Sequence, residues 1–456
     1  METIANIVLK QHCYFNTNST KSIRYRKEQL QKLKSILQDN EAALYKAIFK
    51  DFKKSEFDTY TSELALVYHE IDTALKNITK WSRKKSVKSN PLNIPSKNYI
   101  YPEPLGVCTI IGSWNYPIQL TLSPVIGALA AGNTAILKPS ELTTYTSNLL
   151  AKIINTNFDN SYLYVLEGGI PETTILLEQN VDHIFFTGSS FVGKIVYQAA
   201  AKNLTPVTLE LGGKSPAIIS EHANLEMTAK RLVWSKFLNA GQTCIAPDYV
   251  IIQETVKNKF IKLCKQEIEK SQYSFSNNNY TQIISENHFN RLSHFLNEGT
   301  IEIGGTTNLA ERYIAPTLIS DISFENSCMQ EEIFGPILPI LSYTKIDDAI
   351  SLIKQKDKPL SLYLFTEENN EKEKVISQIS FGGGCINDAI MHITNSNLPF
   401  GGVGASGIGN YHGKYSFETF SHFKSIISKP TWFELPLKFS PLTANKLKWI
   451  KRIMKL

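Results

Sequence analysis

The chain has 456 residues, of which 42% are hydrophobic and 20% charged, and its net charge is +6. This length exceeds what one hydrophobic core normally supports, so at least two domains are expected. The mild charge gives no reason to expect nucleic acid as a partner, and no apolar run is long enough to span a bilayer. The polar N-terminal residues, with an early acid, do not resemble a signal peptide.

The six cysteines and nine histidines indicate the compartment and the metal requirement. No two cysteines form a Cys-x-x-Cys pair, and a chain of this size does not need disulfides for stability. Free thiols in a reducing compartment, and therefore a cytoplasmic location, are expected. The histidines lack metal-ligand spacing, so no catalytic metal is predicted.

The N-terminal part is predicted to be helical up to about residue 85. Apolar residues recur at helical spacing among polar ones throughout residues 24–85. Residues 86–103 change in character, because three prolines surround Tyr99-Ile100-Tyr101. This segment is predicted to be an extended arm or a hairpin.

From residue 104 onward, strands and helices alternate. In the first unit, strands are predicted at 106–111, 134–138, 162–167 and 183–186, and helices at 120–131, 143–155 and 191–201. In a second unit that begins near Gly213, strands are predicted at 217–219, 249–253, 337–343 and 360–365, and helices at 225–237, 254–270 and 347–354. The polar segments 276–280 and 367–373 are predicted to be loops. This alternation predicts an α/β fold with parallel sheets covered by helices.

Cys244 stands out among the cysteines by its surroundings. It follows Asn239-Ala240-Gly241-Gln242-Thr243, a small, polar stretch that is a poor core strand, whereas Cys108, Cys264, Cys328 and Cys385 sit beside apolar or small residues. Upstream, Glu210 lies between two leucines and precedes Gly212-Gly213; strand alternation also allows it to face solvent. A thiol and a tunable carboxyl group are the two groups needed to form and hydrolyse a thioester.

A strand-to-helix turn at residues 187–193 is a candidate phosphate site. The strand 183–186 runs into Thr187-Gly188-Ser189-Ser190-Phe191-Val192-Gly193, where backbone N–H groups at a helix start favour phosphate. The glycines do not have the G-x-G-x-x-G spacing, so on spacing alone a tight turn without a ligand fits equally well.

Besides the segments around Gly188, Glu210 and Cys244, six further short motifs stand out: Pro104-Leu105-Gly106-Val107, Ser113-Trp114-Asn115-Tyr116-Pro117, Gly132-Asn133-Thr134, Lys138-Pro139-Ser140-Glu141, Glu331-Glu332-Ile333-Phe334-Gly335-Pro336 and Pro399-Phe400-Gly401-Gly402. In their order and spacing these nine motifs resemble the aldehyde dehydrogenase superfamily, and the resemblance extends from about residue 20 to residue 425. The short N-terminus, Cys244 to Tyr249 and Tyr411 to Lys414 resemble the class 3 branch.

The resemblance implies two doubly wound, Rossmann-like parallel-sheet domains and a small oligomerisation arm. The NAD-binding domain would comprise residues 1–85 and 104–210, with a return segment at about 388–413, and the catalytic domain residues 211–387. Residues 86–103 and 414–437 would form the arm, followed by a basic amphipathic tail at 438–456.

The resemblance also implies NAD(P)-dependent oxidation of an aldehyde to a carboxylic acid. Cys244 would attack the carbonyl, and Asn115 and the Cys244 N–H would stabilise the alkoxide. After hydride transfer to the nicotinamide, Glu210 would activate the water that hydrolyses the thioester. A cysteine-dependent acyl or thioester hydrolase without redox chemistry, and a non-catalytic binding protein on the same fold, are the alternatives.

Cofactor and substrate residues follow from the same resemblance. Those expected at the cofactor are Lys138, Glu141, Gly188, Ser189, Val192, Gly193, Leu211, Gly212, Glu332 and Phe334. A carboxylate at position 141 would repel a 2′-phosphate, which favours NAD, with NADP also accepted. Those expected at the substrate are Trp114, Tyr116, Trp234, Ile393, Thr394 and His412, although Trp234 could equally be a core residue. Medium- or long-chain aliphatic or aromatic aldehydes are expected, including lipid- or terpenoid-derived ones.

Relatives in class 3 suggest a homodimer that forms through Asn98 to Tyr101 and Phe417 to Ile427. The tail from Lys438 contains six Lys or Arg residues and no acid, which equals the whole net charge. A helix is predicted to start at Ser440-Pro441, with basic and apolar residues on different sides. Two interpretations stay open: packing on its own subunit or the partner, and peripheral contact with an anionic membrane surface.

Overall fold

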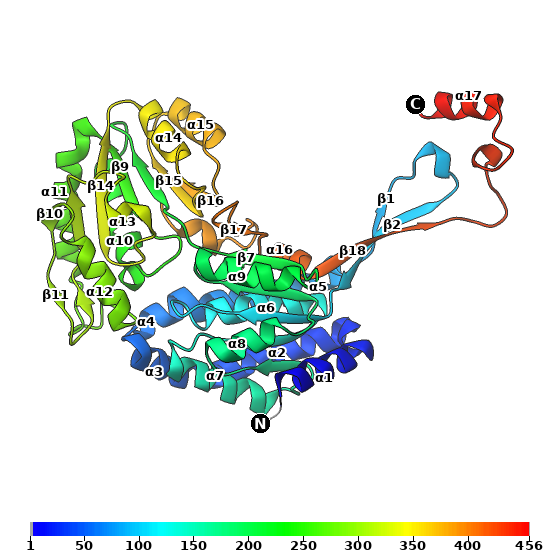
Figure 1. The fold of residues 1–456 in the computed structure, drawn as a ribbon, viewed down its shortest axis with the longest axis horizontal. Coiled ribbons are helices and arrows are strands. Elements are labelled where there is room, and N and C mark those ends of the chain that lie inside the picture. Colours follow the sequence, from blue (N-terminus) through cyan, green and yellow to red (C-terminus); the bar gives the residue numbers. More distant parts are fainter. Residues whose placement is uncertain (1–2, 456) are drawn as a thin grey trace.

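The computed structural model describes residues 3–455 and consists of two mainly parallel sheets, their covering helices and a projecting arm (Figure 1). Met1, Glu2 and Leu456, which fall within the predicted domain and tail ranges, lie outside the described residues. The α/β fold with two doubly wound sheets is confirmed.

A helical layer forms the N-terminal part of the chain. It consists of α1 (Ile4–Asn16), α2 (Ile23–Asp39), α3 (Glu41–Phe52), α4 (Glu56–Thr59), the π-helical turn η2 (Tyr60–Leu64) and α5 (Ala65–Trp81). In α2, Leu30, Leu33 and Leu37 repeat at helical spacing and are fully buried. The predicted helical region 24–85 is confirmed, whereas α1 was not predicted.

The first sheet has six strands in the order β17-β7-β6-β3-β4-β5. Its strands are β3 (Val107–Ile111), β4 (Thr134–Lys138), β5 (Leu163–Val165), β6 (His183–Thr187), β7 (Val207–Glu210) and the antiparallel β17 (Gly407–Ile408). Its helices are α6 (Gln119–Ala131), α7 (Thr144–Asn157), α8 (Ile170–Leu177) and α9 (Ser190–Ala201). The chain leaves β3 towards β4 on one side and returns to β6 on the other, so a crevice opens beyond the carboxyl ends of β3 and β6.

The second sheet has seven strands in the order β10-β13-β14-β9-β8-β15-β16. They are β8 (Pro216–Ile219), β9 (Tyr249–Gln253), β10 (Thr300–Ile303), β13 (Thr317–Ser320), β14 (Ile337–Tyr343), β15 (Ser361–Phe365) and β16 (Gly383–Ile386), and β11 (Thr307–Asn308) and β12 (Tyr313–Ile314) form a separate ribbon. Its helices are α10 (Leu225–Phe237), α11 (Lys257–Ser271), α12 (Glu286–Phe295), α13 (Ser327–Gln330), α14 (Ile346–Lys354) and α15 (Asn369–Gln378).

The predicted loop at 367–373 is wrong, because α15 begins at Asn369. The first half of this helix is polar, and its buried contact, Val375, falls beyond the segment that was interpreted as a loop. An amphipathic helix that exposes its first turns therefore looks like a loop in a short window.

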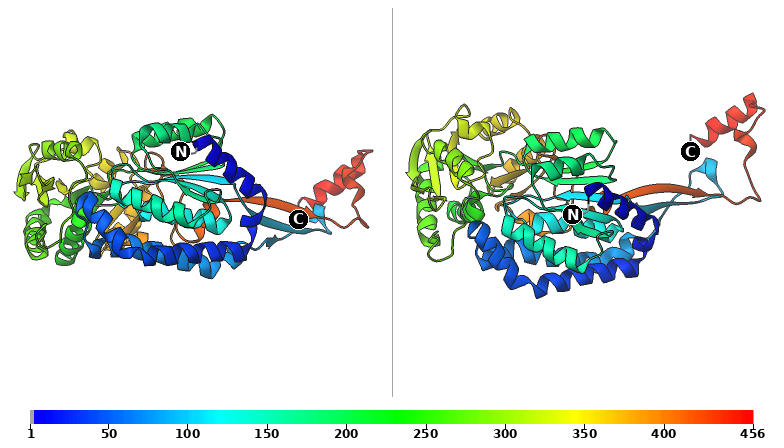
Figure 2. Two further views of the ribbon diagram at one scale, coloured as in Figure 1. Left: turned by 90° about the horizontal axis from the view of Figure 1, so that it is seen from below. Right: turned by 60° about the horizontal axis from the view of Figure 1, so that its bottom comes forward.

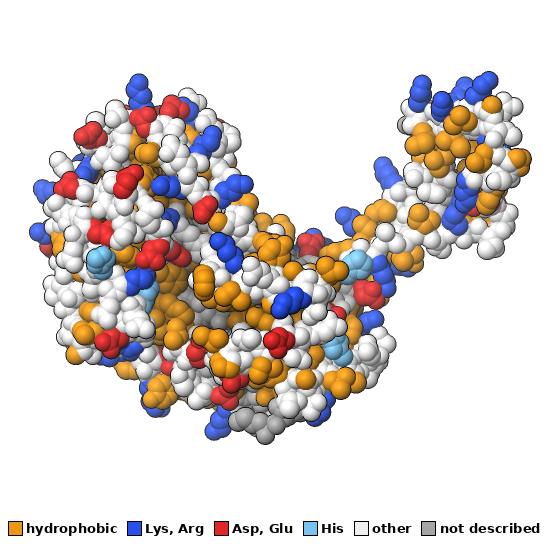
Figure 3. Space-filling view, in the orientation of Figure 1, with side chains coloured by type: hydrophobic (Ala, Val, Ile, Leu, Met, Phe, Trp, Pro, Cys, Tyr) orange, Lys and Arg blue, Asp and Glu red, His pale blue; other side chains and the backbone are white. Residues whose placement is uncertain are grey.

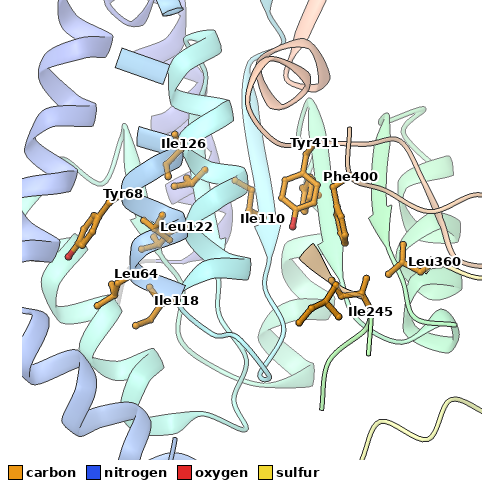
Figure 4. Packing of buried hydrophobic residues seen from close by; sticks show 14 of the residues in the cluster. Leu64, Tyr68, Ile110, Ile118, Leu122, Ile126, Ile245, Leu360, Phe400 and Tyr411 are labelled. Carbon is orange, nitrogen blue, oxygen red and sulfur yellow. The ribbon is translucent and has the colours of Figure 1, made fainter. Parts of the chain in front are cut away.

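One hydrophobic cluster extends across both sheets, and each unit has a further cluster of its own. In Figure 4, Ile110 of β3 lies between Leu122 and Ile126 of α6 on one side and Phe400 and Tyr411 on the other. Ile245 and Leu360 extend the same cluster into the second unit. Because Ile245 directly follows Cys244, this core anchors the segment that carries the candidate nucleophile.

The arm is a three-stranded antiparallel sheet that stands away from the body (Figures 1 and 2). Its order is β1 (Lys85–Val87), β2 (Lys97–Pro104) and β18 (Ser421–Ser428), and Ser421 pairs with Pro104 and Ser428 with Lys97. The short helix α16 (Lys414–Thr419) leads from the body into β18. The extended arm predicted at 86–103 is confirmed, with β18 as an edge strand.

The tail beyond the arm contains the turn η7 (Pro436–Lys438) and the helix α17 (Ala444–Ile453). The predicted helix start at Ser440-Pro441 is wrong, because Thr443 is the N-cap and its side chain accepts a hydrogen bond from Lys446 N. The helix is well exposed: Leu447 is 52% and Trp449 56% accessible.

Candidate active site

The candidate site is a cavity of about 820 Å³ at the carboxyl ends of β3, β6 and β7, where they face the second sheet. It is lined on one side by Trp114, Asn115, Gly188, Ser189, Glu210, Leu211 and Gly212, and on the other by Cys244, His288, Arg291, Glu332 and Phe334. The fold therefore brings together residues from five of the separated motifs.

Cys244 lies in a loop whose backbone conformation is fixed by buried polar contacts. The turn before it, η4 (Leu238–Gly241), has positive φ at Asn239, Ala240 and Gly241. A side chain at position 241 would overlap the Gly335 carbonyl, so glycine is required there. Gln242 is fully buried and donates to Asn239 O and Gln282 O, at 3.1 Å each. These bonds hold Cys244 at the cavity wall.

The Cys244 thiol is unreactive until a base removes its proton. Burial raises the pKa of this thiol to about 12, and the nearby carboxyl groups of Glu332 and Glu210 add to the effect. Since the thiolate is the nucleophilic form, catalysis requires an acceptor for this proton. The other cysteines expected to be buried, Cys108, Cys264 and Cys328, are buried, while Cys385 is partly exposed.

Glu210 ends strand β7 and points into the site rather than to solvent. It is only 3% exposed, and both carboxyl oxygens lack a hydrogen-bond partner within residues 3–455. Burial raises the pKa of Glu210 well above its usual value. A buried, unpaired carboxyl group is costly for folding, so its position indicates a chemical role.

Asn115 supplies an amide next to the nucleophile loop. It is buried, and its Nδ2 donates to Gln242 O at 3.1 Å, which leaves the second amide hydrogen for another acceptor. The adjacent Tyr116 hydroxyl lies 2.6 Å from Thr243 Oγ1, one residue before Cys244. Asn239 Nδ2 also donates to Asn115 O at 3.0 Å, so three hydrogen bonds join the Asn115 turn to the Cys244 loop.

A buried ion pair supports this turn from the helical layer. Lys54 Nζ lies 2.8 Å from Glu63 Oε1, and both side chains are fully buried. The other Glu63 oxygen accepts the backbone N–H groups of Ile118 and Gln119 at the start of α6, at 2.8 and 3.2 Å. Lys54 Nζ also lies 4.0 Å from the centre of the Tyr116 ring. Tyr116 is thus engaged through both its ring and its hydroxyl.

The turn from β6 into α9 has the features of a phosphate site. Ser189 is the N-cap of α9, and its side chain accepts from Val192 N at 3.3 Å. A Cβ at Gly193 would overlap Leu211, and one at Gly188 would overlap the Phe186 ring. These glycines allow the close helix–strand packing that exposes the helix N-terminus to the cavity.

Lys138 and Glu141 lie close together beyond the end of β4. Lys138 is buried and donates to Pro139 O at 2.7 Å, while its Nζ lies 3.5 Å from Glu141 Oε2. Burial lowers the pKa of Lys138 despite this acidic neighbour. The half-exposed Glu141 carboxylate is free to accept hydroxyl groups.

Glu332 and Phe334 form the opposite wall of the cavity. A side chain at Gly212 would overlap the Glu332 carboxylate, so this carboxylate lies directly against the Gly212-Gly213 turn. Burial raises the pKa of Glu332 to about 8. The Phe334 ring contacts Trp114 edge-to-face, with 5.3 Å between centroids.

Four residues that hold this wall were missed by the sequence analysis. Lys214 bonds to Asp248 and to the carbonyls of Cys328 and Glu331, and Asp248 accepts from Ile333 N. His288 and Arg291 contact the same segment from α12. The one signal in the sequence was the spacing of His288 and Arg291 by one helical turn, and it does not reveal what the helix faces.

The predicted substrate residues are distributed unevenly. Trp114 and Tyr116 lie beside Asn115, and His412 is buried against Tyr411, with ring centroids 4.3 Å apart. Ile393 and Thr394 lie in the turn η6 (Met391–Thr394). Trp234 is 45% exposed on α10, so it is not a core residue, and it does not line the cavity described above.

The described residues contain neither a candidate metal site nor a helix that could span a membrane. Between residues 3 and 455, no group of three or more His, Cys, Asp or Glu side chains is arranged to hold a metal ion. No helix in this same range combines the length and the apolar character that crossing a membrane requires.

A turn suited to phosphate, a half-buried cysteine and an unpaired carboxyl group at one cavity are features expected of a dinucleotide-dependent enzyme with a thiol nucleophile. Comparison with known proteins is consistent with this class. A model of the aldehyde dehydrogenase family matches residues 2–426. A 4,4'-diaponeurosporen-aldehyde dehydrogenase of Staphylococcus aureus is 47% identical over 97% of both chains. Mouse aldehyde dehydrogenase family 3 member A2 is 44% identical over 97% of this chain and 93% of its own.

Solved structures agree with the sequence relatives. One described as the substrate-bound state of Staphylococcus aureus AldH has a TM-score of 0.97 and 46% identity, and each chain covers all of the other. A Mycobacterium tuberculosis aldehyde dehydrogenase complexed with NAD+ has a TM-score of 0.86 and 26% identity, over 95% of this chain and 92% of its own.

The chain belongs to the aldehyde dehydrogenase family and is an NAD(P)-dependent aldehyde dehydrogenase. The predicted enzyme class is confirmed, in preference to an acyl hydrolase or a non-catalytic binding protein.

Proposed function

We propose that Cys244 is the nucleophile, Glu210 the general base, and Asn115 with the Cys244 backbone N–H the oxyanion donors. The observation that carries this assignment is the unpaired Glu210 carboxyl group, which is buried at the same cavity as the protonated thiol. Neither group benefits the fold where it lies, whereas together they supply a proton acceptor and a nucleophile.

The chain's residues then act in sequence. Glu210, directly or through a water, accepts the Cys244 proton, and the sulfur bonds to the aldehyde carbon. The second Asn115 amide hydrogen and the Cys244 N–H stabilise the negative oxygen. A bound nicotinamide would accept the hydride that leaves the former aldehyde carbon, so that an acyl thioester remains on Cys244. Glu210 releases its first proton to solvent and becomes a carboxylate again. Water then attacks the acyl group while Glu210 takes a proton from this water, the C–S bond breaks, the acid leaves, and the sulfur takes the proton back from Glu210.

An NADH-production assay with octanal tests these roles. The parent enzyme is expected to produce NADH, Cys244→Ala to produce none, and the control Cys13→Ala, at an exposed thiol, to match the parent. Release of acid from an octanoyl thioester, with no NADH formed from octanal, would instead favour hydrolase chemistry.

We propose that the turn at Gly188, Ser189, Val192 and Gly193 faces the pyrophosphate, and that Lys138 and Glu141 face the adenosine ribose. Glu332 would hold the nicotinamide ribose, with Phe334, Leu211 and Gly212 beside it. The Glu141 side chain is half exposed. Its carboxylate supports a preference for NAD, because its negative charge would repel the 2′-phosphate of NADP. A Canis lupus familiaris relative named as NADP-preferring supports acceptance of NADP as well. A kcat/KM comparison for the two cofactors, with Glu141→Gln, tests the preference.

We propose medium- or long-chain aliphatic or aromatic aldehydes as substrates, including lipid- or terpenoid-derived ones. Trp114, which lines the cavity beside Asn115, supports an apolar substrate, as does the relative named for 4,4'-diaponeurosporen-aldehyde. Tyr116, Trp234, Ile393, Thr394 and His412 would surround the substrate path outside the cavity described above. In an NADH assay, kcat/KM should be higher for octanal, hexadecanal and benzaldehyde than for succinic semialdehyde, because the Trp114 and Phe334 rings at the cavity disfavour a carboxylate. The cavity cations Lys214 and Arg291 already bind carbonyl and carboxyl groups of the chain.

We propose that the protein is a homodimer formed through the arm. Strand β18 is the outer strand of its sheet, and its backbone groups on that side have no strand partner within the described chain. Phe423 and Ile427 on this strand are 43% and 55% exposed. A long, exposed edge strand with apolar side chains is a ready template for another chain. Light scattering at micromolar concentration should give the dimer mass, and a stable monomer or tetramer would contradict it.

We propose that the tail makes peripheral contact with an anionic membrane surface. Figure 3 shows apolar side chains gathered at the end of the arm, with Lys and Arg along the outer edge. Trp432, Leu442 and Met454 are 79%, 78% and 70% exposed. Exposed aromatic and aliphatic groups next to basic ones suit the interface of an anionic bilayer.

Vesicle co-sedimentation distinguishes the membrane from the partner subunit as the occupant of this surface. The full chain should pellet with phosphatidylglycerol vesicles at low salt, less at high salt, and weakly with phosphatidylcholine vesicles. A chain that ends at Pro436 should stay in the supernatant. Equal pelleting of the two chains would leave the tail to the partner subunit.

A further inference from the structure

His288 is a cavity residue to which the proposed chemistry gives no role. It lies in the first turn of α12, and its ring contacts both Trp114 and Phe334 edge-to-face, with centroids 5.9 and 6.3 Å away. Trp114 and Phe334 also contact each other. The three rings therefore connect the turn that carries Asn115 to the segment that carries Glu332.

The position of the proton on the His288 ring follows from its neighbours. Arg291 Nη2 lies 3.2 Å from His288 Nδ1, and a guanidinium can only donate, so Nδ1 is the acceptor. The ring proton of the neutral form is then on Nε2, which lies 2.8 Å from Phe334 O and donates to it. Burial and the charge of Arg291 lower the pKa of His288 to about 4, so the ring is neutral at physiological pH.

Together, His288 and Arg291 bind three consecutive carbonyls of the cofactor wall. Arg291 donates to Glu332 O at 3.2 Å and to Ile333 O at 2.5 Å, and His288 donates to Phe334 O. Phe334 has φ of +52°, a left-handed conformation that costs energy for a residue with a side chain. The bonds from α12 therefore hold a backbone that would otherwise relax.

We propose that His288 is a positioning residue that, as the Nε2–H tautomer fixed by Arg291, holds the Phe334 carbonyl and so orients Glu332 and Phe334 for the cofactor. Through its ring contact with Trp114, the same residue links the cofactor wall to the Asn115 turn. The inference rests on the proposed function for the roles of Glu332 and Asn115. Loss of the Nε2 donor should weaken cofactor binding more than aldehyde binding.

Two substitutions separate the hydrogen bond from the ring. His288→Gln keeps an N–H donor near the Nε2 position without the ring, and His288→Phe keeps a ring without the donor. An exposed residue on the same helix, His294, provides the matched control His294→Phe. Because His288→Phe leaves the Phe334 carbonyl without its donor, a loss of roughly tenfold in NAD affinity is expected for this variant.

The measurement is the NAD dissociation constant of the full-length protein by calorimetry, together with KM for NAD and for octanal. His288→Phe should raise the dissociation constant and KM for NAD about tenfold, with KM for octanal within twofold. For His288→Gln, the loss of NAD affinity on a logarithmic scale should be at most half of that for His288→Phe. The control His294→Phe should have the NAD affinity of the parent.

Either of two results would overturn the inference: unchanged NAD affinity in His288→Phe, or equal losses in the Gln and Phe variants. If His288→Phe does not fold, Arg291→Lys provides the test. Lysine lacks the guanidinium that donates to His288 Nδ1 and to the carbonyls of Glu332 and Ile333, so this variant should show the same selective loss of NAD affinity. Calorimetry does not need turnover, so failure of the proposed chemistry would leave this binding result interpretable.

Discussion

The cavity around Cys244 and the arm with its tail depart from ordinary folding rules in opposite ways. At the cavity, the Glu210 carboxyl group is buried without a partner and the Cys244 pKa is raised to about 12. At the end of the arm, large apolar side chains such as Trp432 and Leu442 are 79% and 78% exposed. One region hides polar groups and the other exposes apolar ones.

Under the proposed function, both departures mark places where the chain binds something else. A buried carboxyl group without a partner is stabilised when it hydrogen-bonds to a bound substrate or water. An exposed apolar surface is stabilised when a protein or membrane surface covers it. The surrounding core, in which Ile245, Phe400 and Tyr411 pack closely, has neither defect. The comparison predicts large catalytic effects from changes at the cavity and small ones from changes at the tail.

The largest effect is expected from Cys244→Ala. Removal of the proposed nucleophile should reduce NADH production by at least about a thousandfold, because covalent catalysis would be lost. NAD affinity by calorimetry should stay within threefold of the parent, since the cofactor wall is unchanged. Substantial NADH production by this variant would mean that the oxidation does not proceed through the sulfur.

Glu210→Gln should slow turnover by roughly a hundred- to ten-thousandfold, the range for loss of a general base. A stopped-flow trace should keep a burst of NADH followed by slow turnover if Glu210 acts mainly on the hydrolytic water. Loss of the burst together with the turnover would place it mainly in the activation of Cys244.

The raised pKa of Glu210 also sets the direction of two pH effects. The carboxylate form increases with pH, so turnover of the parent should rise on the alkaline side, and the Gln variant should lack this rise.

The folded state holds the Glu210 proton more tightly than the unfolded state, so folding stability falls as the pH rises above the usual pKa of 4.5. Thermal unfolding at pH 8 relative to pH 5 should therefore show a smaller loss of Tm for Glu210→Gln than for the parent.

Asn115→Ala should reduce kcat by about a hundred- to a thousandfold, the range for one oxyanion donor. The loss should fall mainly on kcat, with KM for octanal within a few-fold, because the donor acts as charge develops on the oxygen. Asn115→Asp offers a matched control for shape, and it should be equally slow since a carboxylate cannot donate. An unaffected rate in either variant would remove Asn115 from the oxyanion site.

Much of the fold and the centre of the site were predictable from local patterns. The runs at 107–111 and 134–138 are apolar throughout, as expected for strands buried on both faces of a parallel sheet. The small, polar surroundings of Cys244 set it apart from the other cysteines without any structure.

What could not be predicted depends on contacts between distant segments. Alternation left Glu210 free to face either side, and only the covering residues of the second unit determine that it is buried. The roles of Glu63, His288 and Arg291 depend on which backbone groups lie opposite them, from 41 to 56 residues away along the chain. The start of α17 was misplaced because Thr443, rather than Pro441, provides the cap.

The smallest catalytic effect is expected from removal of the tail after Pro436. Helix α17 is exposed along most of its length, and Lys446 Nζ bonds back to Phe439 O within the tail itself. Turnover of a water-soluble aldehyde such as benzaldehyde should therefore stay within twofold of the full chain, and the dimer mass should be kept, because β18 ends at Ser428. With hexadecanal presented in anionic vesicles, the truncated chain should be several-fold slower, since it no longer concentrates at the surface. A comparable loss with benzaldehyde, or a shift to monomer, would show that the tail packs on the partner subunit.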